Sequence, residues 1–235
     1  MRHIRLFSAL LACASPLCAQ APQPSAAISA QALDRAAPDM AGALADARPV
    51  TARHAMVVSD QHLATEVGVK ILKAGGNAVD AAVAVGYALA VTDPCCGNIG
   101  GGGFMLIHLA GGRNLFLDFR EKAPGKATAT LFQDAAGNVI PDESVKSWRA
   151  IGVPGTVMGL NEALARYGTM SRKRVMAPAI ALAKRGFVLV PGDVKIFASR
   201  NADFAKEPNV AAIFLNKGQP WRAGERLVQA RLART

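Results

Sequence analysis

The first folded segment shows apolar side chains recurring every three or four residues: Leu63, Val67 and Ile71. This period predicts a helix. Gly75-Gly76 follows as a stop signal, and Ser59 or Asp60 is placed to cap the start. Residues 55–59, AMVVS, are mostly apolar and predict a short strand before the helix.

A second helix is predicted at residues 78–91, which read AVDAAVAVGYALAV. Asn77 is a suitable N-cap, and Asp80 places a negative charge in the first turn, where the helix dipole favours it. Pro94 ends the helix, because the residue before a proline is pushed out of helical geometry. The segment is apolar almost all round and too short to span a membrane, which indicates a buried core helix.

A glycine loop, Gly100 to Gly103, leads into a predicted β-hairpin. Its strands are residues 104–109 and 114–119, and Gly111-Gly112 forms the turn between them. Side chains on the second strand alternate between two faces. One face carries Leu115, Leu117 and Phe119, and the other carries Phe116, Asp118 and Arg120.

Two amphipathic helices are predicted next, at residues 155–167 and 171–185, and Gly186 caps the second. The tail, residues 201–235, shows short turns and charges. We expect it to finish without a closing element.

The composition indicates a globular protein rather than a disordered one. Of the 235 residues, 51% are hydrophobic and 19% are charged. Lys and Arg number 27 against 17 Asp and Glu, a net charge of +10. We expect no nucleic-acid partner, because the basic residues are scattered and few aromatic side chains are available for stacking. The charge is better explained if this is the basic half of a protein with an acidic remainder.

The first 21 residues have the pattern of a secretory signal peptide. A basic start precedes a short apolar run, Leu6 to Cys13, and small residues around Ala19 offer a cleavage site. The alternative is a lipoprotein signal in which Cys13 carries the lipid anchor. Both alternatives export the chain, so we expect a periplasmic or secreted protein. Residues 22–54, rich in Ala, Pro, Gln and Ser, are interpreted as a flexible leader.

Cys95 and Cys96 are adjacent, and a disulfide between neighbours is strained. We interpret them as two small buried thiols. The histidines match no metal-binding spacing, and His108 alternates with apolar residues on a strand, which favours a structural role. The sequence therefore predicts neither a metal site nor a disulfide framework.

Two features remain as candidates for chemistry. The glycine run fits neither a phosphate-binding motif nor a lipase-type oxyanion loop, so close packing of a helix against a sheet is favoured. Arg120 stands at a strand end, where its guanidinium can bind a carboxylate in a bidentate manner. On spacing alone, an ordinary ion pair with Asp118 or Glu121 is favoured.

Four segments, taken in order, resemble the γ-glutamyltransferases: GGNAVDAAVAVGYALAVTDP, GNIGGGGFMLI, LDFREKAPGKAT and GVPGTVMGLNEALARYGTM. The resemblance covers residues 55–235 and identifies them with the large-subunit region of that family. It implies an α+β fold, the αββα sandwich of the N-terminal-nucleophile hydrolases, with only the large-subunit portion present. Such a portion alone is expected to leave unpaired sheet edges and an exposed apolar face.

The family makes a precursor that cuts itself and frees a threonine at the start of a small subunit. That threonine attacks γ-glutamyl amides such as glutathione, and the acyl group passes to water, an amino acid or a peptide. The resemblance implies that Arg120 binds the α-carboxylate of the γ-glutamyl group, and that no cofactor is needed. The nucleophilic threonine is expected outside this sequence, so the chain should be inactive without the small catalytic subunit.

Two alternatives stay open at this point. One is a related N-terminal-nucleophile amidase of the cephalosporin-acylase kind, which acts on glutaryl amides. The other is an inactive homologue that binds γ-glutamyl ligands.

Overall fold

The computed structural model describes residues 49–235, so the predicted signal peptide and most of the leader lie outside the described residues. Residues 49–54 have neither helix nor strand, and residues 52–235 form one compact unit. Across the described part, every helix is too short or too polar to cross a bilayer.

The described helices are α3 (His62–Lys73), α4 (Ala78–Thr92), α5 (Glu143–Lys146), the 3-10 helix η1 (Trp148–Ala150), α6 (Thr156–Tyr167), α7 (Arg172–Arg185), α8 (Pro191–Ala198), α9 (Asn201–Phe204), α10 (Pro208–Phe214) and α11 (Ala230–Arg234). The described strands are β1 (Phe104–His108), β2 (Asn114–Asp118), β3 (Phe187–Val188) and β4 (Arg226–Leu227). This mixture of helices with small antiparallel sheets confirms the α+β class.

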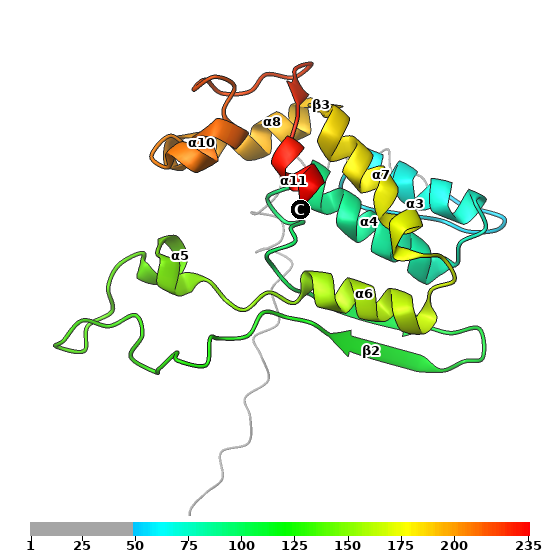
Figure 1. Cartoon of the computed structure of the whole chain (residues 1–235), viewed down its shortest axis with the longest axis horizontal. Coiled ribbons are helices and arrows are strands. Elements are labelled where there is room, and N and C mark those ends of the chain that lie inside the picture. Colours follow the sequence, from blue (N-terminus) through cyan, green and yellow to red (C-terminus); the bar gives the residue numbers. More distant parts are fainter. Residues whose placement is uncertain (1–48) are drawn as a thin grey trace, which may run out of the picture. The chain divides into compact units, whose positions relative to one another are not determined.

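Helix α4 forms the centre of the core, as its apolar sequence predicts. Val83, Ala84 and Ala88 are completely buried. Their small side chains allow α3, α7 and α6 to pack around α4, and Figure 1 shows α3 and α7 beside it with α6 below. The predicted boundaries hold as well, since Asn77 caps the helix and Thr92 ends it just before Asp93-Pro94.

Asp80 joins the start of α4 to the loop before α7. Its carboxylate accepts hydrogen bonds from the backbone N–H of Asn77 and Met170, and from both the N–H and the hydroxyl of Thr169. Burial raises the pKa of Asp80, but these hydrogen bonds outweigh burial and leave the pKa below its ordinary value. A carboxylate expected only to complement the helix dipole therefore also ties together segments about ninety positions apart.

The glycine loop and hairpin form where they are predicted. Strands β1 and β2 pair antiparallel with Leu106 opposite Phe116, and Gly112 takes a φ of 83° in the turn. The outer face of the hairpin leaves Phe104, Leu106 and Phe116 more than half exposed, with the two phenyl rings stacked at 5.6 Å. This exposed apolar face agrees with the expectation for a large-subunit portion alone.

Glycines allow α6 to lie directly on the end of β2. Phe119 is buried, and a Cβ added at Gly159 would overlap its ring, while one added at Gly155 would overlap its carbonyl oxygen. The amides of Gly155 and Thr156 both donate to the carbonyl of Gly101, at 2.8 and 3.0 Å. Within the glycine run itself, a Cβ added at Gly102 would lie 2.5 Å from the Phe119 carbonyl oxygen, so the run packs against the end of β2. The close helix–sheet contact that the sequence favoured for the run is made by Gly155 and Gly159 instead.

The strand predicted at residues 55–59 is wrong. The segment is irregular, and Met56 and Val58 are 49% and 82% exposed. In the described part of the chain no strand pairs with it, so its β-forming residues lack a ladder partner. The predicted cap is also displaced, because Gln61, not Ser59 or Asp60, accepts from the N–H of Leu63.

The tail is more ordered than predicted. Besides the short helices α9, α10 and α11, strand β4 pairs with β3 from the middle of the chain. Gln229 then anchors α11, since its side-chain amide donates to the carbonyl of Val91 in α4 at 2.7 Å. Two-residue strands carry no readable period, which is why the pattern did not indicate them.

The expectation that Cys95 and Cys96 are buried is also wrong, because both are exposed. They lie in the turn that follows α4, where Pro94 has already diverted the chain from the core.

Candidate functional site

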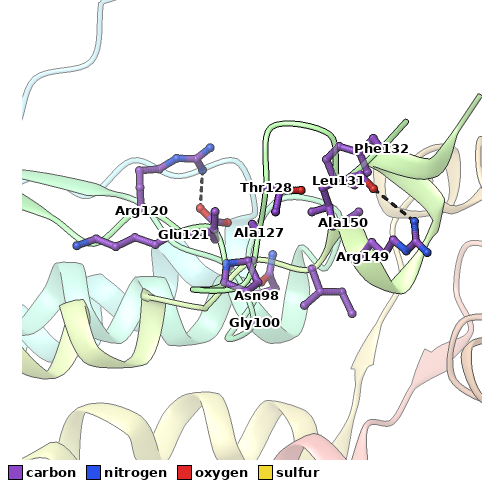
Figure 2. Close-up of a pocket in the computed structure, with 16 residues that line it drawn as sticks. Asn98, Gly100, Arg120, Glu121, Ala127, Thr128, Leu131, Phe132, Arg149 and Ala150 are labelled. Atoms are coloured by element: carbon purple, nitrogen blue, oxygen red, sulfur yellow. Dashed lines mark hydrogen bonds and ion pairs between the residues drawn. The ribbon is translucent and has the colours of Figure 1, made fainter. Parts of the chain in front are cut away.

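A cavity of about 640 Å³ lies between the glycine loop and the segment that follows β2. Asn98, Gly100 and Gly101 supply one wall, and Arg120 to Pro124 supply another. The lining is completed by residues 149–152 and by Ala127, Thr128, Leu131 and Phe132. Figure 2 shows Arg120 and Glu121 toward one end of this cavity and Arg149 toward the other.

Arg120 is held at the end of β2 by its backbone. Its N–H donates to the Asp118 carboxylate at 3.0 Å, and Phe119 pairs with Gly103 through two backbone hydrogen bonds. The guanidinium lies 6.0 Å from the centre of the Phe104 ring, within range of a cation–π contact. Strand geometry and the ring thus fix the direction of the side chain.

The guanidinium is 57% exposed and pairs with the neighbouring carboxylate, since Nη1 lies 2.9 Å from Oε2 of Glu121. This is one of the two ion pairs that the spacing suggested, whereas Asp118 binds the backbone instead. The arginine side of this pair is exposed, whereas Glu121 Oε2 is buried and has no hydrogen-bond partner among the described residues. The exposed side of the guanidinium leaves N–H donors available to a ligand carboxylate.

The opposite end of the cavity holds a second guanidinium that sequence reasoning missed. Arg149 donates to the Leu131 carbonyl at 3.4 Å and lies 3.6 Å from the Glu143 carboxylate. It belongs to no recognisable motif. It lies just before Val153, which pairs with Lys122 on the opposite wall in an isolated bridge. The cavity therefore has a guanidinium at each end, and each is paired with a neighbouring carboxylate.

The model of the γ-glutamyltranspeptidase family matches residues 64–235 of this sequence. The chain belongs to the γ-glutamyltranspeptidase family. It is 58% identical over 188 residues to a glutathione hydrolase proenzyme from Pseudomonas sp. (strain A14), covering 80% of this chain and 33% of that relative. The chain thus spans about a third of the length of the curated relatives it matches.

The γ-glutamyltranspeptidase of Helicobacter pylori has a similar fold, with a TM-score of 0.77 and 43% identity. The match covers 80% of this chain and 54% of that one. The fold class is therefore that of the N-terminal-nucleophile hydrolases, and the chain corresponds to the large-subunit portion of the family's αββα sandwich.

Family membership does not by itself separate the two amidase activities considered above. An Acylase ACY 1 proenzyme from Pseudomonas sp. (strain V22) is 41% identical over 199 residues, covering 82% of this chain and 36% of that relative. The higher identity, 58%, is to a glutathione hydrolase proenzyme.

Proposed function

We propose that this chain is the large-subunit portion of a γ-glutamyltransferase, or glutathione hydrolase, which cleaves γ-glutamyl amides such as glutathione. The observation that carries the proposal is Arg120, a half-exposed guanidinium fixed at a strand end beside a cavity. The identity of this chain to glutathione hydrolase proenzymes supports the same substrate class.

In this proposal Arg120 binds the α-carboxylate of the γ-glutamyl group. Two parallel N–H···O hydrogen bonds from a guanidinium fix both the position and the plane of a carboxylate. The substrate carboxylate displaces Glu121, which stays close enough to orient the guanidinium or to accept a hydrogen bond from the substrate ammonium group.

The partner is the small catalytic subunit of the same precursor, which supplies the nucleophilic threonine. Its hydroxyl attacks the γ-glutamyl carbonyl, and its own α-amine accepts the hydroxyl proton. The C–N bond then breaks as the α-amine passes this proton to the departing amine, which leaves the γ-glutamyl group as an ester on the threonine. Water, an amino acid or a peptide then takes the γ-glutamyl group from the acyl-enzyme. The chain described here binds and orients the substrate and has no activity alone.

The decisive experiment measures hydrolysis of a chromogenic γ-glutamyl anilide by this chain, alone and after mixing with a separately produced small-subunit half. We expect activity only in the mixture. Activity of the chain alone would contradict the proposal, because it would require a nucleophile within these residues. Absence of activity in a mixture that forms a stable complex would favour the inactive homologue that only binds γ-glutamyl ligands.

A cephalosporin-acylase-like amidase is the second candidate, because an acylase proenzyme is 41% identical to the chain. The same mixture distinguishes the two. Faster turnover of a glutaryl amide than of the matched γ-glutamyl amide would favour the acylase. Both substrates carry the terminal carboxylate, so the comparison isolates the α-amino group, which only the γ-glutamyl amide has.

We also propose that the protein is exported to the periplasm or secreted, on the basis of the basic and apolar pattern in residues 1–21. Fractionation of cells expressing the chain tests this. Retention in the membrane fraction that is abolished by Cys13→Ser would indicate the lipoprotein signal, whereas a soluble, shortened product would indicate ordinary cleavage.

A further inference from the structure

The turn after α4 brings three metal-binding groups together. A carboxylate oxygen of Asp93 and the thiols of Cys95 and Cys96 all lie within 4.8 Å of one another. The turn is closed by the carbonyl of Asp93, which accepts from the N–H of Cys96 at 3.2 Å and of Gly97 at 2.8 Å. These backbone hydrogen bonds therefore hold the three metal-binding groups close together.

Asp93 lacks the partners that a buried carboxylate ordinarily has. The residue is only 8% exposed, and its side chain accepts a single hydrogen bond, from the Cys95 thiol at 3.1 Å. A thiol is a weak donor. Among the ion pairs of residues 49–235, none involves Asp93. Neither carboxylate oxygen is buried without a partner, so the carboxylate keeps acceptor capacity that a cation can use.

We propose that Asp93, Cys95 and Cys96 together bind one divalent cation of the zinc and cadmium type. With Zn–S bonds of about 2.3 Å and Zn–O bonds of about 2.1 Å, tetrahedral coordination places the ligand atoms about 3.6 to 3.8 Å apart. In the structure the Cys95 thiol lies 3.1 Å from Asp93 Oδ1 and all three groups lie within 4.8 Å, so ion binding requires shifts of about 1 Å. Two sulfur ligands with one oxygen favour a soft or borderline ion over Mg²⁺ or Ca²⁺.

Binding of the ion as thiolates releases the thiol protons, as it does at other thiolate sites.

The site is open to solvent on the sulfur side. Both cysteines are exposed, and Cys95 also lines a cavity of about 450 Å³ with Phe197 and Phe214. Arg200 lines the same cavity but pairs with Asp203 at 3.6 Å, so its charge is already compensated. Three protein ligands leave a fourth position for water.

The test uses the 235-residue chain with Cys13→Ser and Cys18→Ser, so that Cys95 and Cys96 are its only thiols. Under reducing conditions it is titrated with Cd²⁺, whose bonds to thiolates absorb in the ultraviolet, and then with Zn²⁺ in competition. We expect one ion per chain and protection of both cysteines from alkylation, located by mass spectrometry of the peptides. Cys95→Ser and Asp93→Asn should each weaken binding at least about 10-fold.

A matched control is Asp134→Asn, which removes an exposed carboxylate from another turn and should leave affinity unchanged. The alkylation result needs no cluster variant, so it stands even if Cys95→Ser fails to fold. Unprotected thiols, an affinity insensitive to Asp93→Asn, or one ion shared by two chains would each overturn the proposal.

Discussion

At the scale of single residues, the Arg120 side chain meets two requirements that usually conflict. A side chain that binds a substrate must remain available to it, yet its direction must be fixed before the substrate arrives. Here the backbone of β2, the Phe104 ring and Glu121 fix the guanidinium while it stays 57% exposed. The surrounding contacts are weak enough to be exchanged for a ligand carboxylate.

Replacement of Arg120 by lysine tests this role in the complete enzyme. Lysine keeps the charge but loses the bidentate geometry, so we expect KM for a γ-glutamyl substrate to rise roughly 10- to 100-fold. Arg113→Lys, in the exposed hairpin turn, is the matched control and should leave KM unchanged. Equal KM values for the two variants would refute the role of Arg120.

Asp80 is expected to matter for stability. In Asp80→Asn an amide group would face the N–H donors that the carboxylate now accepts from, and we expect a loss of about 2 to 3 kcal/mol in the free energy of unfolding. Chemical denaturation measures this loss. Asp142→Asn, which removes a carboxylate from an exposed ion pair with Lys146, should cost less than about 1 kcal/mol.

The pH dependence follows from the lowered pKa of Asp80. The unfolded chain has the higher pKa, so the stabilisation is complete above about the ordinary value of 3.8 and is lost as the pH falls through the lower folded value. The unfolding free energy of the unsubstituted chain should therefore fall more steeply below pH 3.8 than that of Asp80→Asn. Parallel curves would show that Asp80 does not contribute to the acid sensitivity.

At the scale of elements, the contact between α6 and the end of β2 positions the site. The glycine loop, Phe119 and the start of α6 are held within hydrogen-bonding distance, and Arg120 follows directly from this contact. Helix α6 can approach so closely only because Gly155 and Gly159 present no side chain toward the strand.

Gly159→Ala is expected to destabilise the chain by about 1 to 3 kcal/mol, because the buried Phe119 ring must move to make room for the methyl group. Gly192→Ala is the control: it is also helical, but an added Cβ meets nothing within 4 Å. That variant should be neutral or more stable by up to about 1 kcal/mol. Thermal unfolding compares the two, and equal stability would mean that the α6–β2 contact is looser than described.

At the scale of the folded unit formed by residues 52–235, the outer face of the hairpin is apolar. Phe104, Leu106 and Phe116 are exposed side by side on a two-stranded sheet. Such a patch on a sheet with free edges is typical of an interface and promotes association when uncovered. We propose that the small subunit of the complete enzyme covers this face.

We expect the isolated chain to self-associate through this face, and Leu106→Lys to shift it toward monomer in sedimentation measurements. The unfolding free energy should change by less than about 0.5 kcal/mol, since Leu106 is 76% exposed. Val145→Lys replaces a similarly exposed side chain in α5 and should not alter association. A monomeric unsubstituted chain would contradict the expectation.

The sequence by itself determined the elements whose signals are local. Helix α4 follows from an unbroken apolar run with its own cap and its own stop, and the hairpin from alternation around a glycine turn. The segment around Arg120 also carries a local signal, because its residues are contiguous, whereas the binding role of Arg120 stays a prediction from the family resemblance. In each case a few neighbouring residues carry the information, so no distant contact was needed to interpret it.

Tertiary structure alone decided the features that depend on distant partners. Strands β3 and β4 exist because Phe187 meets Leu227, and residues 55–59 are no strand because no ladder partner lies beside them. Arg149 reaches the cavity, and Cys95 reaches the solvent, through packing that no local pattern records. Short strands and burial gain their free energy from contacts across the chain, and only the folded arrangement specifies those contacts.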